Sequence, residues 1–378
     1  MFGTVLIAAC TVMQLYVFWR AATVPLVARR VPRRLLVGGG VLLWAVFAAG
    51  HWLGHGGTGR LSAALELISL TWMAALFLLF VALLAIDLFT GFGYFAPRLA
   101  PALRGWALLG GTLLSAVALV QGLRPPVVEG YEVRLAGLPA AMDGTVVAGI
   151  SDLHLGSLLG AGWLAARVDQ VLALHPDAIV LLGDIFEGHG APESGLLPEL
   201  SRLRARLGVW AVTGNHESHG RSNASVRLLE SAGIEALHDR WVELGPGLVL
   251  AGVDDLTSLQ RSGRGGDPIS EALAGRPQGA TILLSHTPWQ ADEAARLGAG
   301  LMLSGHTHGG QIWPFGYLVR MVYPLLGGRY DVDGMPVIVC QGTGTWGPRM
   351  RLWRPGEILR ITLRSPAGEG GPPGRPAG

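Results

Sequence analysis

Four uncharged, mostly apolar stretches of about 20 residues dominate the first third of the chain. They cover residues 1–19, 35–53, 67–86 and 105–123. A helix needs about 20 such residues to cross the roughly 30 Å hydrocarbon core of a bilayer, because each residue adds about 1.5 Å. The sequence therefore predicts a transmembrane region of four helices over residues 1–124.

A cleaved signal peptide is the alternative interpretation of residues 1–19. Such a leader carries basic residues before its apolar core. Here the first arginine, Arg20, comes after the apolar stretch. The order of charge and apolar residues therefore favours a retained helix.

The arginines between the apolar stretches are unevenly distributed. Seven lie in the first and third connections and one in the second: Arg20, Arg29, Arg30, Arg33, Arg34, Arg98 and Arg104 against Arg60. Short cytoplasmic loops are enriched in Lys and Arg. We therefore expect an integral, multi-pass protein of the cell membrane, with everything after Leu123 on the extracytoplasmic side. The simplest role for the helices is that of an anchor.

The rest of the chain differs from the apolar region in charge. The net charge is +6 on residues 1–130 and −4 on residues 131–378. No basic run with interleaved aromatic residues occurs in the second part, so a nucleic-acid partner is not expected. The two cysteines, Cys10 and Cys340, lie in separate apolar runs, and a disulfide framework is excluded.

Short β-branched runs alternate with amphipathic stretches after Pro126. The expected strands are 146–150, 179–182, 209–212, 249–253, 281–284, 301–303 and 337–340, and the expected helices 163–174, 196–207, 222–231 and 289–297. This alternation predicts an α/β domain. We expect a linker and first edge strand over 125–145, the folded domain over 146–362 and a disordered tail over 363–378.

Polar blocks follow five of the expected strands. They are SDLH at 151–154, GD at 183–184, GNHE at 214–217, SHT at 285–287 and GHTHGG at 305–310. Side chains at the carboxyl ends of strands gather at one edge of an α/β sheet. Carboxylates, carboxamides and imidazoles are ligands for Mn²⁺, Fe or Zn²⁺. Each block alone is weak, but five in order predict a metal site.

The five blocks resemble the calcineurin-like metallophosphoesterase superfamily, whose pattern is D-x-H, GD, GNH(E/D), H and GHxH. The resemblance covers about residues 131–362. The variants SDLHLG, GNHE and GHTHGGQ look most like the bacterial membrane-associated branch, whose relatives act on phosphodiesters and lipid-linked pyrophosphates. The resemblance implies a β-sandwich flanked by helices (αββα), here preceded by four transmembrane helices.

The resemblance also implies a dinuclear centre of two divalent ions, Mn, Fe or Zn. The implied ligands are Asp152, His154 and His308 for one ion and Asn215, His286 and His306 for the other, with Asp184 bridging. A hydroxide that bridges the metals would be the nucleophile, so no serine or cysteine is needed. His216 is the implied catalytic residue, which either protonates the leaving oxygen or stabilises charge on the phosphoryl group.

Other polar residues near the blocks have less defined roles. Supporting or turn positions are expected for Glu217, Asp254 and Asp255; the cleft could be lined by His189 and His219; and a phosphate could meet Arg349 and Arg351.

The sequence thus predicts a membrane-anchored, metal-dependent phosphoric ester hydrolase. Its partners would be membrane lipid and a phosphoester substrate, a phosphodiester or lipid-linked pyrophosphate. The alternatives are a nucleotide phosphodiesterase or phosphomonoesterase merely tethered to the membrane, and a non-catalytic receptor that retains the fold. Seven intact ligands argue against the receptor. A phosphoprotein phosphatase would carry a GDYVDRG-like block where GDIFE stands at 183–187. The sequence makes no prediction of oligomeric state.

Overall fold

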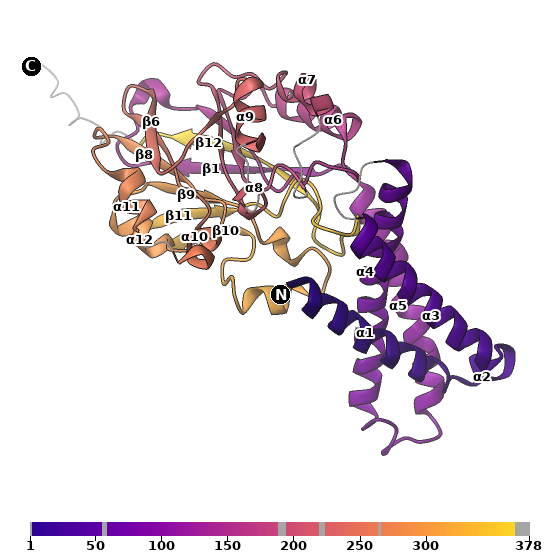
Figure 1. The fold of residues 1–378 in the computed structure, drawn as a ribbon. Helices are drawn as coiled ribbons and strands as arrows, with labels where there is room; N and C mark the ends of the chain where they lie inside the picture. Colours follow the sequence, from indigo (N-terminus) through magenta and orange to yellow (C-terminus); the bar gives the residue numbers. More distant parts are fainter. Residues whose placement is uncertain (1, 55–58, 188–193, 219–223, 264–265, 367–378) are drawn as a thin grey trace, which may run out of the picture. The chain divides into compact units, whose positions relative to one another are not determined.

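The chain groups into two compact units. The computed structural model describes residues 2–54, 59–187, 194–218, 224–263 and 266–366. We call the first group the helical unit, which comprises Met1–Pro125, Gln311–Trp313 and Thr345–Pro355, and the second the α/β unit, which comprises Pro126–Gly310, Pro314–Gly344 and Gly356–Gly378 (Figure 1).

Five α-helices and one π-helical turn are described in the helical unit. They are α1 (Phe2–Ala21), α2 (Pro25–Arg30), α3 (Arg33–Ala49), the π-helical turn η1 (Gly50–Gly54), α4 (Arg60–Phe89) and α5 (Ala100–Leu123). Four helices are long and apolar enough to cross a membrane: Gly3–Ala21, Arg33–Leu53, Arg60–Phe89 and Ala100–Leu123. The prediction of four such helices is confirmed.

One fully buried carboxylate, that of Asp87, connects three helices of this unit. Its Oδ2 lies 2.6 Å from Nε of Arg20, and its Oδ1 lies 2.7 Å from an amino nitrogen of Arg104. The Tyr16 hydroxyl donates to the same carboxylate. Because the three partners come from α1 and α5, this cluster fixes both helices to α4.

Two segments from late in the chain complete the helical unit. Ile312 forms an isolated parallel β-bridge with Leu352. Met350 and Leu352 are buried in a cluster with Ala118 of α5 and with residues of α4. The Arg351 amide donates to the Ala118 carbonyl over 2.9 Å. The predicted boundary at residue 124 did not include these segments, because each is a short loop whose apolar partners lie far away in the sequence.

Two six-stranded sheets form the centre of the α/β unit. The first has the order β1-β12-β2-β3-β4-β5 and the second β10-β11-β9-β8-β7-β6. Among the strands that the structure describes, only β12–β2, β10–β11 and β6–β7 are antiparallel pairs. The first sheet contains β1 (Val127–Arg134), β2 (Val146–Ile150), β3 (Ala178–Leu182), β4 (Val209–Val212), β5 (Glu235–Ala236) and β12 (Glu357–Arg364). The second contains β6 (Arg240–Gly245), β7 (Leu248–Gly252), β8 (Ala280–Leu284), β9 (Leu301–Ser304), β10 (Gly328–Val332) and β11 (Met335–Val339).

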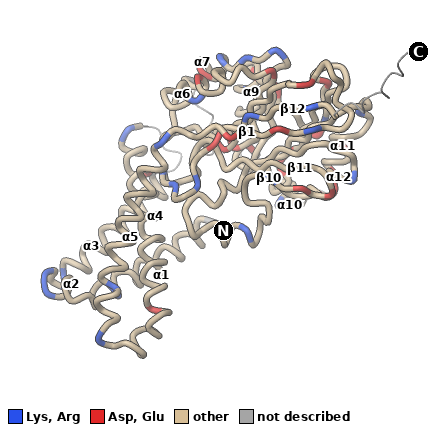
Figure 2. Tube along the Cα trace, turned by 180° about the vertical axis from the view of Figure 1, so that it is seen from behind, with Lys and Arg blue, Asp and Glu red and all other residues tan. Residues whose placement is uncertain are grey.

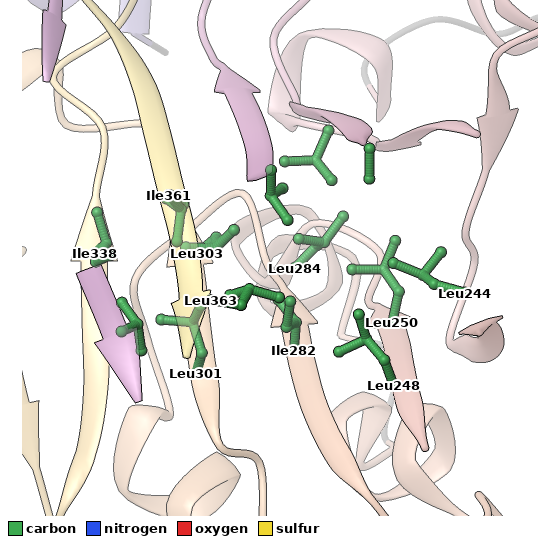
Figure 3. Close-up of a cluster of buried hydrophobic side chains, with 14 of the residues drawn as sticks. Leu244, Leu248, Leu250, Ile282, Leu284, Leu301, Leu303, Ile338, Ile361 and Leu363 are labelled. Carbon is green, nitrogen blue, oxygen red and sulfur yellow. The ribbon is translucent and has the colours of Figure 1, made fainter. Parts of the chain in front are cut away.

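The two sheets pack face to face, and helices cover their outer faces (Figure 1). Side chains of both sheets fill the space between them, among them Leu250, Ile282, Leu303 and Ile361 (Figure 3). The helices are α6 (Ala161–Leu172), α7 (Leu197–Leu200), α8 (Asn215–Ser218), α9 (Ala224–Ser231), α10 (Leu256–Ser262), α11 (Pro268–Leu273), α12 (Ala291–Arg296) and α13 (Gly316–Arg320), with 3₁₀ turns at Ala140–Met142, Ser194–Leu196 and His308–Gly310. The predicted αββα fold is confirmed.

Some predicted boundaries differ from the structure. The helix expected over 196–207 ends at Leu200, because the chain turns twice before Gly208, whose φ of 92° is left-handed, and enters β4. The last strand continues to Arg364, two residues beyond the predicted end of the domain. Most of the predicted tail, residues 367–378, lies outside the described residues.

Candidate metal centre

The five polar blocks converge at the carboxyl ends of parallel strands from both sheets. The blocks follow β2, β3 and β4 of the first sheet and β8 and β9 of the second. In parallel neighbours these ends lie at the same edge. The sandwich therefore brings the two sets together where the sheets face each other.

One group of metal-ligand side chains consists of Asp152, His154 and His308. Their ligand atoms lie within 4.8 Å of one another, and all three residues are buried. The Nε2 atoms of His154 and His308 are 3.1 Å apart, and His308 Nε2 lies 3.3 Å from Asp152 Oδ1. This is the first of the two ligand sets that the resemblance implied.

A second group consists of Asp184, His286 and His306, again within 4.8 Å. His286 Nε2 lies 3.3 Å from Asp184 Oδ2 and 3.1 Å from His306 Nδ1. The Nδ1 atom of His286 is 2.7 Å from the Leu182 carbonyl. Since a carbonyl only accepts hydrogen bonds, Nδ1 carries a hydrogen, and Nε2 is the ring nitrogen that faces the site.

Asp184 also belongs to a third group, with His154 and His216. Its Oδ2 is 4.0 Å from Nε2 of each of these histidines. Asp184 thus connects the residues of both sides, the position expected of a bridging ligand. The geometry alone allows His216 to act as a ligand as well as a proton donor.

The GNHE block places Asn215 and His216 at the start of α8. The His216 amide donates to Asp184 Oδ1 over 2.9 Å, and the side-chain oxygen of Asn215 is buried. A Cβ atom on Gly214 would lie 2.2 Å from Asp184 Oδ1, so only glycine allows α8 to approach the bridging carboxylate. The block therefore depends on its glycine as much as on its polar side chains.

The backbone at the site is held in an uncommon conformation. Positive φ angles of 46–70° occur at five of the seven predicted ligands: Asp152, His154, Asp184, His306 and His308. Left-handed backbone at a non-glycine residue costs of order 1–3 kcal/mol and persists where the surroundings impose it. Such strain clusters at functional sites, so its presence at five predicted ligands supports a functional role for this group of residues.

Glu187 is a site residue that the sequence reasoning missed. Its Oε2 lies 2.5 Å from His154 Nδ1, and its Oε1 lies 3.5 Å from His216 Nδ1. A carboxylate on Nδ1 directs the other ring nitrogen of His154 toward the ligand group. The signal was present in the sequence, as an acidic residue three positions after Asp184 in GDIFE.

Glu217 supports the loop that carries Asp184. Its buried carboxylate accepts hydrogen bonds of 2.8–3.0 Å from the amides of Asp184, Ile185, Phe186 and Gly214. Burial and the nearby Asp184 charge raise the pKa of Glu217. Its expected role as a supporting residue agrees with these contacts. Asp255 likewise accepts from Thr287 beside His286 and from Thr257 and Ser258.

Buried charges in the site perturb the histidines in opposite directions. Burial disfavours the charged form of His154, but Glu187 outweighs it and raises the pKa to about 9. Burial similarly opposes, and Asp184 overcomes, the charging of His286, whose pKa lies well above its ordinary value. Burial and the charge of His286 lower the pKa of His306 to about 4, and burial lowers the pKa of His216. Clustered carboxylates and imidazoles with such shifts are typical of functional sites.

The donor set fits two divalent cations. It provides carboxylate oxygens and imidazole nitrogens in two groups, and Asp184 of one group lies 4.0 Å from His154 of the other. The described residues near it include no thiolate. These ligand types suit Mn²⁺, Fe or Zn²⁺. At least one histidine on each side has its other ring nitrogen fixed by an acceptor, as is usual for metal ligands.

Of the other candidates from the sequence, two belong to the helical unit and two are not among the described residues. Arg351 is buried in the helical unit and donates to the Arg354 carbonyl over 3.0 Å, which makes it a packing residue. Arg349 belongs to the same segment. His189 and His219 lie outside the described residues.

Comparison with known proteins gives consistent matches. The family described as "Calcineurin-like phosphoesterase" matches residues 145–310. A Bos taurus protein called "Transmembrane protein with metallophosphoesterase domain" is 35% identical over 71% of this chain and 63% of its own length. A Danio rerio protein of the same name is 34% identical over 68% and 62%. An "Uncharacterized metallophosphoesterase" of Aquifex aeolicus is 33% identical over 63% of this chain and 91% of its own length. The chain thus spans less than two thirds of the two vertebrate relatives.

Proposed function

The chain belongs to the calcineurin-like metallophosphoesterase family, and on that premise we propose that it is a membrane-anchored, dinuclear phosphohydrolase that cleaves phosphodiesters or lipid-linked pyrophosphates. Membership makes it a metal-dependent phosphoesterase. The relatives include bacterial and animal proteins, and two of them are named as transmembrane proteins. Anchoring in a membrane accords with those names and with the four apolar helices.

The observation that carries the proposal is the sharing of Asp184 between two groups of ligand side chains. Two cations in such a site polarise phosphoryl oxygens and supply an activated water at neutral pH. Asp152, His154 and His308 would hold one, and Asn215, His286 and His306 the other. The protein's contribution is to keep these seven side chains, five of them buried and Asn215 and His306 half-buried, oriented before substrate arrives.

Glu187 and His216 have the remaining chemical roles. Glu187 accepts from His154 and so holds that ring in position. His216 lies edge-on to His154, with ring centroids 4.8 Å apart. Its side chain is 20% exposed, against 2%, 0% and 7% for His154, His286 and His308. This exposure lets His216 reach a leaving oxygen, which it would protonate or stabilise through its N–H group.

We place the α/β unit on the extracytoplasmic side. Arg20 and Arg104 pair with Asp87 inside the helical unit and are not free loop charges. The bias persists without them, because Arg29, Arg30, Arg33, Arg34 and Arg98 still oppose Arg60. Figure 2 shows basic residues in the region of α2.

The reaction is tested on purified full-length protein with a chromogenic phosphodiester and the matching monoester. Activity that needs Mn²⁺ or Zn²⁺, disappears with chelator and prefers the diester would support the proposal. Monoester preference would redirect it to a phosphomonoesterase. Absence of metal-dependent hydrolysis of either ester, with metal bound, would indicate a receptor that has kept the fold.

The orientation is tested by labelling with a membrane-impermeant thiol reagent in intact cells. Single cysteines replace the exposed residues Ser262 in α10 and Ala28 in α2, in a background without Cys10 and Cys340. We expect labelling at position 262 and none at 28 until the membrane is permeabilised. The reverse pattern would place the α/β unit in the cytoplasm without affecting the proposed chemistry.

A further inference from the structure

One short segment carries most of the exposed large hydrophobic side chains among the described residues of the α/β unit. Phe315, Tyr317, Leu318, Met321 and Val322 lie on or beside α13 and are 40–81% exposed. Among the described residues of this unit, the other large hydrophobic side chains with comparable exposure are Val127 and Val128 at the start of β1. Scattered exposed hydrophobic residues are normal, whereas a concentration in eight residues indicates a contact surface. We call residues 315–322 the apolar lip.

The apolar lip is attached to the loop that carries two metal ligands. A Cβ atom on Gly310 would lie 2.2 Å from the Gly316 Cα, so the two backbones touch. Thr307, between His306 and His308, donates to the Leu326 carbonyl over 2.5 Å. The lip therefore begins on a contact with the His306–Gly310 loop, and a second contact follows at Leu326, four residues after its end.

Aromatic residues continue the apolar surface from the lip to the metal centre. The ring of Tyr323, directly after Val322, meets His306 edge-on with centroids 4.7 Å apart. Trp289 also stacks on Tyr323, with ring centroids 5.3 Å apart. An apolar substrate chain that contacts the lip can thus extend along Val322 and Tyr323 to the ligand His306, and neither Val322 nor Tyr323 carries a charge.

The charge of the segment suits a lipid surface. Residues 311–330 contain Arg320 and Arg329 and no acidic residue. Apolar and aromatic side chains with a few basic ones are the composition of segments that lie in a bilayer interface and contact anionic headgroups. A soluble protein partner has no comparable reason to exclude acids from twenty residues.

The covalent structure brings the membrane close to this segment. Trp313, two residues before Phe315, belongs to the helical unit, where its ring lies 5.1 Å from that of Trp353. The Trp353 amide donates to Gln121 near the end of α5, and both tryptophans are exposed. Exposed tryptophans at the end of a span are typical of a membrane–water interface. The lip is therefore joined to that interface by Pro314 alone.

We propose that the apolar lip lies in the outer interface of the phospholipid bilayer and delivers amphiphilic phosphoesters to the His306 side of the metal centre. The delivery rests on the proposed hydrolase function, whereas the bilayer contact does not. The acyl or prenyl part of the substrate would follow Val322 and Tyr323 while its phosphate reaches the ligands.

The bilayer contact is tested with an environment-sensitive fluorophore on Leu318→Cys. The full-length protein, with Cys10 and Cys340 replaced by Ala, is placed in phosphatidylcholine nanodiscs with or without spin-labelled lipids. We expect a blue-shifted emission that spin-labelled lipids quench, as for a label at Leu109→Cys in α5 and unlike one at the exposed Ser231→Cys in α9. A label at 318 that spin-labelled lipids do not quench would overturn the proposal. A blue-shifted but unquenched label would indicate contact with a protein partner or a second copy, and an unshifted label would indicate contact with water.

Delivery is tested with the double variant Leu318→Glu/Met321→Glu in mixed micelles. We expect kcat/KM for a lipid phosphodiester to fall at least about tenfold, since burial of one large apolar side chain contributes at least that factor. Hydrolysis of a small chromogenic diester should be unchanged. The control Arg204→Glu changes the net charge equally at an exposed site. Equal loss on both esters, or no loss on either, would overturn delivery; a wild type inactive on both would contradict the hydrolase function and leave the labelling result intact.

Discussion

Both units bury aspartate side chains, but they surround them with different cationic groups. In the helical unit Asp87 faces the guanidinium groups of Arg20 and Arg104. In the α/β unit Asp152 and Asp184 face imidazoles, those of His308 and His286 at 3.3 Å. Both arrangements offset the cost of burying a carboxylate, which is otherwise several kcal/mol.

The difference between the partners determines what each cluster can do. A guanidinium remains protonated in proteins, so the Asp87 cluster already has its full complement of positive charge. An imidazole can lose its proton and offer the same nitrogen to a metal ion. A buried carboxylate paired with arginines therefore indicates a structural contact between helices. A buried carboxylate surrounded by several histidines indicates a site that can exchange protons for metal ions.

Among the variants that test this difference between the two clusters, Asp184→Ala should have the largest effect. The variant removes the side chain common to two ligand groups. Metal content and hydrolysis should fall together, with activity reduced at least about 10²-fold because both sides lose a ligand. Elemental analysis and the chromogenic assay measure the two quantities. The exposed Asp169→Ala is the control, and full activity in Asp184→Ala would rule out a bridging role.

His216→Ala should separate chemistry from metal binding. The expected loss of rate is about 10²–10⁴-fold, the range that general acid–base catalysis contributes, with both metals retained. The same two measurements apply. If the variant loses metal, and its remaining activity is proportional to the metal that it keeps, His216 is a ligand, as its place beside Asp184 and His154 also allows.

Asp87→Asn should damage stability and spare catalysis. It leaves two buried guanidiniums without their anion, a change that costs about 3–5 kcal/mol. Thermal unfolding in detergent measures the effect, and the folded fraction should hydrolyse the small ester at the normal rate. Asp169→Asn, which breaks the exposed pair with Arg202, should cost less than about 1 kcal/mol. Equal stability of the two variants would contradict the structural role of the Asp87 cluster.

The smallest effect concerns the protons that metal binding releases. Glu187 raises the pKa of His154 to about 9 in the metal-free protein, so at pH 7.5 the ring is protonated and must lose about one proton to bind metal. Metal affinity should therefore rise with pH up to about 9. In Glu187→Gln the pKa falls toward its ordinary value, and the release should drop by about one proton. Calorimetry in buffers of different ionisation enthalpy counts these protons; an identical count would show that Glu187 does not set the protonation of His154.

The sequence contained enough to predict the main architecture because its signals are local. The length of each apolar stretch predicted a spanning helix, and each ligand block follows its strand directly, as His286 follows β8. Glu187 was detectable for the same reason, although its position was not interpreted.

The remaining features depend on contacts between distant residues. Nothing in the sequence around Met350 and Leu352 distinguishes a loop of the α/β unit from one that packs on Ala118. The left-handed backbone at Asp152 and His306 is likewise imposed by tertiary structure, because neither residue type requires it. The apolar lip was present in the sequence as an apolar run, but only its exposure identifies it as a surface.

The position of the last strand has a consequence for the biosynthesis of the protein. β12 lies between β1 and β2, parallel to the first and antiparallel to the second. The two strands that the ribosome makes first in this unit thus share a neighbour that it makes last. Neither can complete its hydrogen bonding before β12 has been synthesised, so the first sheet closes only after all of its other strands have been made and, in the proposed orientation, exported.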